Sequence, residues 1–200
     1  MKNVLRLSTS LFAENSVSSS LSEDLLSAFR AKGNSFSTVH RDFGDEAIPH
    51  LDGEWLTALS TPEGERSEEQ RNKVAFSDLL IAEVKAADTL VISLPMYNFT
   101  VPSMLKAWVD HIARAGVTFA YTAAGPKGLL QNKKVYLVAS MGGIHDTSAT
   151  DFLRPYMKLI MGFIGLDDIE VITASGLNMG EEARAKGIAN AKSEIAALEL

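Results

Sequence analysis

Five short apolar runs alternate with longer amphipathic segments along this chain of 200 residues. The runs are centred on residues 4–7, 37–40, 89–94, 135–139 and 169–173. They are enriched in β-branched side chains, as is typical of strands buried on both faces. Strands that alternate with helices pack as parallel βαβ units rather than as a sandwich or a bundle. The sequence therefore predicts the α/β class, with a five-stranded parallel sheet and helices on both faces.

The segments between the runs have the apolar period of helices. One helix is expected from Val17 to just before Gly33, which is a plausible stop. The residues Ser67-Glu68-Glu69-Gln70 form a capping box that opens the next helix. A third helix should begin near Pro102 and end at Gly116. The last two helices are expected around residues 152–163, with Pro155 near the start, and over residues 181–198.

Two regions interrupt the alternation. The connection over residues 43–66 is long for a compact domain, and such connections are often lids or binding loops. In residues 117–131 the large apolar side chains of Val117, Phe119 and Tyr121 occupy alternate positions, and we expect a hairpin that turns at Gly125-Pro126. Because we find no linker, repeat or low-complexity tract, residues 1–200 are expected to form one domain carrying these two excursions.

The absence of cysteine limits the chemistry open to this chain. It excludes disulfides, thiolate metal sites and redox-active thiol pairs, so electron transfer would need an added cofactor. The four histidines lack the spacing of metal ligands, and no serine hydrolase elbow is present. We therefore expect no metal site and no hydrolase.

Charge and hydropathy narrow the set of partners. The chain has 19 Lys and Arg against 25 Asp and Glu, a formal charge of −6, which disfavours binding to nucleic acid or to an anionic membrane. No apolar run approaches the ~20 residues of a membrane span. Arg6 and Glu14 interrupt the apolar core that a signal peptide would need. We expect a cytoplasmic protein that acts on small molecules.

A turn rich in hydroxyl groups follows the first strand. It contains Ser10, Ser16 and Ser18 and leads into a helix at Val17, where free backbone N–H groups and the helix dipole attract anions. The turn lacks the glycine patterns of dinucleotide and nucleoside triphosphate sites. A monophosphate held by hydroxyl groups fits it. Ordinary N-capping by Ser16 or Ser18 is the alternative interpretation.

Two more loops follow the third and fourth strands. The first carries two aromatic rings, a thioether and an amide, from Met96, Tyr97, Asn98 and Phe99. These side chains either bind a flat, partly polar ring system or tuck under the sheet edge. The second loop contains Ser140, Met141, Gly142 and Gly143, whose backbone can approach a ring closely. His145 beyond it is either a donor to the ligand or a surface histidine without one.

In a doubly wound sheet these three loops lie at the same edge, where one ligand can contact all of them. Flavin mononucleotide (FMN) matches their chemistry. Its phosphate would bind the serine turn, and its isoalloxazine ring would lie on residues 96–99 with the carbonyl-bearing edge toward Gly142 and Gly143.

Four segments resemble those of a known family. They are Pro95-Met96-Tyr97-Asn98-Phe99, residues 113–119 with Tyr121-Thr122, Gly142-Gly143-Ile144-His145 and Gly162-Phe163-Ile164-Gly165. Through these motifs and their spacing, nearly the whole chain resembles the FMN-dependent NADH azoreductases, which are flavodoxin-like bacterial reductases of quinones and azo compounds.

The resemblance implies roles for individual residues. By position, the FMN phosphate and ribityl end would be held by Ser10, Ser16, Val17 and Ser18, and the ring by residues 96–99 and 140–143. It also implies a homodimer with active sites at the subunit interface. Phe119, Tyr121 and Phe163 are candidates for walls of the acceptor pocket, although they could equally be core or dimer contacts. Met141 and Ala120 depart from the family pattern and leave acceptor and nicotinamide preference open.

The predicted activity is an FMN-dependent oxidoreductase working by two-electron ping-pong hydride transfer. NADH or NADPH would give hydride to the flavin and leave, and a quinone or an aromatic azo compound would then take its place. Flavin N5 would be the reactive centre, so no side chain is an obligatory catalyst, with His145 as a possible donor that tunes the flavin. The alternatives are a flavodoxin-like FMN electron carrier and a flavin-binding regulatory module without turnover.

Overall fold

The computed structural model describes residues 2–12, 15–145 and 149–198. Seven strands and six α-helices are described within these ranges. In chain order the elements are β1 (Lys2–Ser8), α1 (Val17–Ala31), β2 (Phe36–Asp42), α2 (Gly53–Ser60), the 3-10 helix η2 (Glu63–Glu65), α3 (Glu68–Ala86), β3 (Thr89–Pro95), α4 (Ser103–Ile112), β4 (Phe119–Thr122), β5 (Gly125–Gly128), β6 (Lys134–Ser140), α5 (Leu153–Phe163), β7 (Asp168–Ala174) and α6 (Glu181–Ala197).

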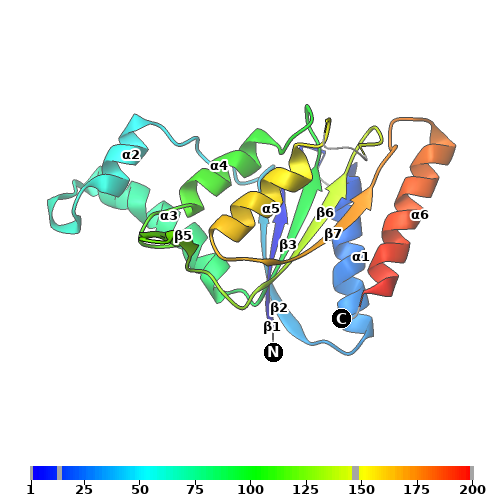
Figure 1. Cartoon of the computed structure of the whole chain (residues 1–200), viewed down its shortest axis with the longest axis horizontal. Coiled ribbons are helices and arrows are strands. Elements are labelled where there is room, and N and C mark those ends of the chain that lie inside the picture. The colour runs from blue at the N-terminus through cyan, green and yellow to red at the C-terminus, as the bar shows by residue number, and fades with distance from the viewer. Residues whose placement is uncertain (1, 13–14, 146–148, 199–200) are drawn as a thin grey trace.

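The five predicted strands form one parallel sheet in the order β2-β1-β3-β6-β7. From β1 the chain runs outward to β2 at one edge, and from β3 it runs outward through β6 to β7 at the other edge (Figure 1). The direction of strand order therefore reverses between β1 and β3. In such sheets a crevice opens at the carboxyl ends of the strands at that point. The predicted fold class is confirmed.

Helices cover both faces of the sheet, with α1 and α6 on one side and α3, α4 and α5 on the other (Figure 1). The pleat of the central strands feeds both layers. In β3, Leu90 and Ile92 pack toward α3 to α5, whereas Val91 packs toward α1 and α6. Each such buried aliphatic side chain contributes about 1.5–3 kcal/mol. This two-sided core explains why the central strands β3 and β6 read as continuous apolar runs. The expectation of burial was wrong for the edge strand β2, which is mostly exposed.

The helix ends largely follow the sequence signals. Ser67 and Gln70 form the predicted capping box of α3, and α1 ends before Gly33, whose φ is +82°. The predicted end of α4 at Gly116 was wrong, because the helix stops at Ile112. There the Thr118 hydroxyl donates to the Ile112 carbonyl oxygen at 2.6 Å, which satisfies a terminal acceptor. In the described ranges, no helix is both long and apolar enough to cross a bilayer.

The excursion over residues 43–66 contains a helix that the sequence analysis did not predict. Asp52 caps α2 by accepting from the Trp55 N–H at 3.0 Å. Trp55 then packs edge-on to the buried imidazole of His111 in α4, with 4.5 Å between ring centroids. The His111 Nε2 atom donates to the Pro49 carbonyl oxygen at 2.9 Å. The excursion is thereby fixed to the α3 and α4 layer.

The second excursion forms the expected hairpin from β4 and β5. Its predicted turn at Gly125-Pro126 was wrong, because both residues already belong to β5 and pair with Thr122 and Tyr121. The turn lies at residues 123–124 instead. The Thr122 hydroxyl closes it by accepting from the Ala124 N–H at 3.2 Å and donating to the Gly125 carbonyl oxygen at 2.7 Å.

Candidate functional site at the carboxyl edge of the sheet

Loops after β1, β3, β6 and β7 meet at the carboxyl edge and enclose a cavity of about 160 Å³. A hollow of about 250 Å³ between α1 and α6 adjoins it and shares Asn15, Ser16, Val17 and Arg184 with it. We call these two adjoining spaces the trough. The cavity is lined by Ser10, Phe12, Asn15, Ser16, Val17, Pro95, Met96, Tyr97, Ser140, Met141, Gly142, Leu177, Asn178 and Arg184.

The serine turn forms one end of the trough. Ser16 is the N-cap of α1 and accepts weakly from the Ser19 N–H at 3.3 Å, so the N-capping interpretation holds for this residue. Ser18 does not line the cavity, because it is fully buried beside Ser16 at 3.1 Å between hydroxyl oxygens. Val17, the first residue of α1, lines the cavity, and the first N–H groups of a helix lack carbonyl partners within the helix. Such donors at a helix start suit an anion.

Buried hydroxyl groups support this turn from below. Ser22 in α1 donates to the Ser18 carbonyl oxygen at 2.8 Å, and its hydroxyl also contacts that of Ser93 in β3 at 2.8 Å. Thr9 donates to the Ser93 carbonyl oxygen at 2.7 Å. These groups lie at 0% exposure, and satisfied buried networks hold their elements rigidly. The start of α1 is therefore fixed against the sheet.

On the edge of the serine turn, Ser8 shares a hydrogen bond of 2.8 Å with Nε2 of His40 in β2. Partial burial, followed by the nearby Arg6 guanidinium, lowers the pKa of His40 below its ordinary value of 6.5. The imidazole is accordingly neutral at pH 7 and adds no charge beside the turn.

Tyr97 joins the first two predicted loops. Its phenol oxygen contacts the Ser10 hydroxyl at 3.2 Å and accepts from the Leu11 N–H at 3.1 Å. The backbone N–H of Met96 donates to the Ser140 carbonyl oxygen at 2.8 Å, which joins this loop to the third. Half-buried Met96 also packs against the larger core, as the packing interpretation expected of it. The three predicted loops are thus brought together.

A tight turn follows at residues 97–100. Tyr97 and Thr100 exchange both backbone hydrogen bonds, at 3.0 and 3.1 Å. Asn98 and Phe99 between them have φ values of +50° and +70°, as in a type I′ turn. Asparagine tolerates this conformation, whereas a bulky residue there stores about 1–3 kcal/mol of strain. Phe99 is 51% exposed, so it does not tuck under the sheet. Neither residue lines the cavity, and both lie beside it.

The glycine loop after β6 is held by the loop after β7, which the sequence analysis missed. Backbone N–H groups of Gly176, Leu177 and Asn178 donate to the carbonyl oxygens of residues 143, 141 and 142 at 2.9–3.1 Å. A Cβ on Gly142 would lie 2.6 Å from the Asn178 side-chain nitrogen. Gly142 is thus required for this close approach. The signal available in the sequence was that the fifth strand ends at the same sheet edge.

The side chains of Met141 and His145 pack against other parts of the protein and do not face the cavity as a pair. The Met141 side chain is 1% exposed within the larger core, although the residue borders the cavity. His145 Nδ1 contacts the Thr150 hydroxyl at 3.0 Å, and its ring lies edge-on to Phe99 at 5.8 Å. The ring also covers Gly143, where a Cβ would lie 3.1 Å from Nε2. Gly143 and His145 do not line the cavity.

The three aromatic residues expected around the acceptor form a separate cluster. Phe119 in β4 packs against Phe163 in α5 at 4.4 Å and against Tyr121 at 5.4 Å between ring centroids. Phe119 is buried, but Tyr121 is 76% exposed. None of the three lines the cavity of the same chain.

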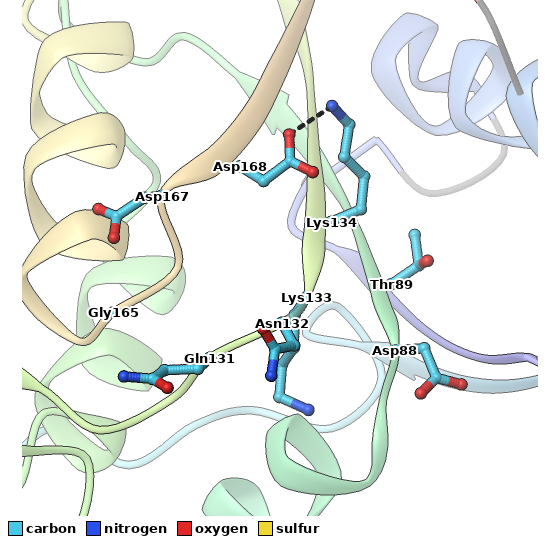
Figure 2. A pocket seen from close by; sticks show the side chains of 9 residues that line it. All are labelled: Asp88, Thr89, Gln131, Asn132, Lys133, Lys134, Gly165, Asp167 and Asp168. Carbon is cyan, nitrogen blue, oxygen red and sulfur yellow. Dashed lines mark hydrogen bonds and ion pairs between the residues drawn. The ribbon is translucent and has the colours of Figure 1, made fainter.

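A larger hollow of about 880 Å³ lies at the opposite, amino-terminal edge of β3, β6 and β7 (Figure 2). It is lined by Asp88, Thr89, Gln131, Asn132, Lys133, Lys134, Gly165, Asp167 and Asp168. Lys134 pairs with Asp168 at 2.6 Å, and Lys133 Nζ donates to the Lys85 and Ala87 carbonyl oxygens. Lys133 thus satisfies carbonyl oxygens at the end of α3, and the Lys134–Asp168 pair joins the starts of β6 and β7. None of these lining residues is aromatic, so the hollow offers a flat ring little to stack on.

Comparisons with known proteins agree with this architecture. A family model described as a flavodoxin-like fold matches residues 2–198. An FMN-dependent NADH:quinone oxidoreductase of Alcanivorax borkumensis is 47% identical over 195 residues, 98% of each chain. One of Vibrio vulnificus is 45% identical over 198 residues, 99% of each chain. The solved structure of an azoreductase from Bacillus anthracis is similar with a TM-score of 0.89 at 27% identity, covering 98% of this chain and 97% of that one.

Proposed function

This chain belongs to the flavodoxin-like family that matches residues 2–198, and we propose that it is an FMN-dependent NADH:quinone oxidoreductase that also reduces aromatic azo compounds. Relatives with 45–47% identity over nearly the full length carry the first of these names, and a structural neighbour is an azoreductase. The observation in the structure that carries the proposal is the convergence of four loops on one trough at the carboxyl edge.

The trough fits FMN by its chemistry. A phosphate would be held at the start of α1 by the backbone N–H groups of Val17 and Ser18. The hydroxyl groups of Ser10 and Ser16, which line the cavity, would donate to it as well. Met96 and Tyr97 offer a half-buried surface for the isoalloxazine ring. Because Gly142 carries no Cβ, the backbone beside Asn178 can approach the ring closely. Asn98, Phe99, Ser140 and Gly143 would complete the binding site from the same loops.

When bound, FMN would supply the hydride chemistry that this cysteine-free chain lacks. The protein's part is to bind, orient and exclude water. Tyr97 joins the loop of residues 96–99 to the serine turn. Backbone N–H groups of the glycine loop would stabilise negative charge on the ring edge, because preorganised donors are strong in a dry site. No described side chain is needed as an obligatory acid or base.

NADH is the electron donor that we propose, and a quinone or an azo compound is the acceptor. Both are flat ring systems and would use the same mouth of the trough in turn, which corresponds to a ping-pong mechanism. Reduced nicotinamide is consumed in this reaction, and the cytoplasm is the compartment that we propose for it.

We further propose a homodimer in which each subunit completes the other's site. Tyr121 is 76% exposed and Leu159 72% exposed, on β4 and α5 respectively. Exposed aromatic and leucine side chains on adjoining elements are typical of an interface. Phe119, Tyr121 and Phe163 do not line the cavity of their own chain. In the homodimer they would instead border the acceptor pocket of the second copy.

The alternatives make different kinetic predictions. An electron carrier would pass single electrons to a protein partner, and a regulatory module would bind FMN without turnover. A carrier usually relies on a strong docking field around an exposed ring, whereas the net charge here is only −6. This modest net charge favours the enzyme over the electron carrier.

The test is anaerobic stopped-flow spectroscopy on protein loaded with FMN. Addition of NADH should bleach the visible flavin absorbance, and addition of a quinone should restore it over many cycles. Initial rates measured against NADH at several fixed quinone concentrations should give parallel double-reciprocal lines, the pattern of a ping-pong mechanism. Protein that binds no FMN, or that is bleached by NADH but not restored by quinone, would contradict the proposal.

A further inference from the structure

Arg184 in the first turns of α6 borders both parts of the trough. Helices α1 and α6 lie side by side on one face of the sheet (Figure 1). Arg184 therefore stands across from Ser16 and Val17, where α1 begins. No motif in the sequence marks this residue, because the relevance of a lone arginine in a polar helix depends on where the helix lies.

The charge of the trough gives this arginine its importance. An FMN phosphate carries roughly −1.5 to −2 charges at neutral pH. The serine turn offers hydroxyls and backbone N–H groups, which donate hydrogen bonds but add no fixed charge. Of the described residues that line the 160 Å³ cavity, Arg184 is the one with a charged side chain.

Most of the five N–H donors of the Arg184 guanidinium remain available for a ligand. Its Nη1 donates to the Leu177 carbonyl oxygen over a long 3.4 Å, and it pairs with no carboxylate of any described residue. Lys192, which borders only the outer hollow, is by contrast paired with Asp24 at 3.2 Å. The Leu177 N–H is itself bonded to Met141 at 3.1 Å. The contact with Leu177 thus anchors the arginine to a loop that borders the same cavity.

We propose that Arg184 binds the phosphate of FMN and sets the preference of this chain for the phosphorylated flavin over riboflavin. The inference rests on the proposed function. Arginine suits the role because its planar fork donates two parallel hydrogen bonds to phosphate oxygens. Cofactor binding would then also join α6 and the loop after β7 to the start of α1.

The test compares dissociation constants of FMN and riboflavin, measured by quenching of flavin fluorescence on the protein freed of cofactor. Arg184→Met should raise the Kd for FMN about tenfold or more, because charge-assisted hydrogen bonds to phosphate are lost. It should leave the Kd for riboflavin unchanged within about twofold. Arg184→Lys keeps the charge without the fork and should recover part of the affinity. Lys186→Met, an exposed change on the same helix, is the matched control and should bind both flavins normally.

Ionic strength gives a second readout. The affinity of the unchanged protein for FMN should fall more steeply with added salt than that of Arg184→Met, since a charge pair is screened. If Arg184→Met binds FMN as tightly as the unchanged protein, the assignment of Arg184 is wrong while the proposed function stands. Equal losses for FMN and riboflavin would also overturn it. If the unchanged protein binds neither flavin, the proposed function fails with it.

Discussion

The two edges of the central sheet both carry hollows, and the smaller one is the better candidate for a binding site. At the carboxyl edge, a cavity of about 160 Å³ is lined by hydroxyl, aromatic and thioether side chains and by Gly142. At the amino edge, a hollow of about 880 Å³ is lined by charged and polar residues (Figure 2). Volume alone would favour the amino edge, whereas the chemistry of the lining favours the carboxyl edge, where parallel sheets bind ligands.

Backbone conformation distinguishes the edges in the same way. The amino edge has Asn132 at φ +59°, and asparagine accepts this conformation readily. The carboxyl edge has Phe99 at φ +70°, where a bulky side chain is strained. Polar groups at the amino edge, such as Lys133, already close helix and strand ends. We propose that the amino edge serves stability and the carboxyl edge serves binding, and substitutions should separate the two roles.

The largest effect is expected from Gly165→Ala at the amino edge. Gly165 has a φ of +98°, and a Cβ there would lie 2.2 Å from the Leu130 carbonyl oxygen, an atom that cannot move aside easily. Backbone strain and overpacking together should lower the free energy of unfolding by about 3 kcal/mol or more. Urea unfolding measures this loss. FMN affinity of the folded protein should stay within about twofold.

The matched control for that substitution is Gly64→Ala, where a Cβ would meet no atom within 4 Å. Its stability should change by less than about 0.5 kcal/mol. A stable Gly165→Ala protein with weakened FMN binding would reverse the roles of the two edges.

The same exchange at the carboxyl edge, Gly142→Ala, should act on binding instead. Its Cβ would lie 2.6 Å from the Asn178 side-chain nitrogen, a flexible group that can swing away and disturb the cavity. We expect the Kd for FMN to rise about 30-fold, near 2 kcal/mol, with a stability loss below about 1 kcal/mol. Fluorescence titration gives the first value and urea unfolding the second. In an Asn178→Ala background the substitution should cost less, and an undiminished cost would show that the contact is not the cause.

Much of this contrast could be predicted from the sequence. Strand and helix positions followed from apolar period, the capping box at Ser67 from its spacing, and the fold class and family resemblance were confirmed. The serine turn, the Met96–Phe99 loop and the glycine loop were expected at one edge and lie there. Their roles toward FMN remain predictions.

The parts that were missed depend on tertiary placement. Helix α2 has only two buried residues, Trp55 and Ala58, too few for a clear apolar period. Asn178 and Arg184 carry no motif, and they matter because β7 ends beside β6 and α6 lies beside α1. The hairpin turn was predicted at Gly125-Pro126 because this dipeptide is typical of turns. The turn forms earlier, where the Thr122 hydroxyl closes it.

A pair of substitutions at Asn98 tests whether the loop of residues 96–99 contacts the flavin. Asn98→Gly keeps the φ of +50° accessible and removes only the amide. If the amide contacts the flavin, the Kd for FMN should rise about tenfold with little change in stability. Asn98→Ala should lose the same affinity and about 1 kcal/mol of stability besides, because alanine disfavours this conformation. Unchanged FMN affinity in Asn98→Gly would remove Asn98 from the site.

The smallest effect concerns pH and a region away from both edges. Burial lowers the pKa of His111 below its ordinary value of 6.5, although its hydrogen bond to Pro49 acts in the opposite direction. Below pH 6.5 the unfolded chain therefore binds more protons than the folded one. The free energy of unfolding should be level above pH 6.5 and should decline as the pH falls from 6.5 toward the folded pKa.

Urea unfolding of the unchanged protein and of His111→Gln across this range measures the contribution of His111. The variant should show a shallower decline. Because the pKa of His40 is lowered in the same direction, His40→Gln serves as the parallel control for the remaining slope. If His111→Gln retains the full slope, its buried imidazole is not responsible. FMN affinity should not change with the loss of His111.

Hydrogen–deuterium exchange with and without FMN tests the central claim most directly, because it reports which edge of the sheet the cofactor covers. Added FMN should slow exchange at residues 16–20, 96–99, 141–143 and 176–178, the loops of the carboxyl edge. Exchange at residues 131–134, beside the amino-edge hollow, should not change. Protection confined to residues 131–134 and 165–168 would contradict the account.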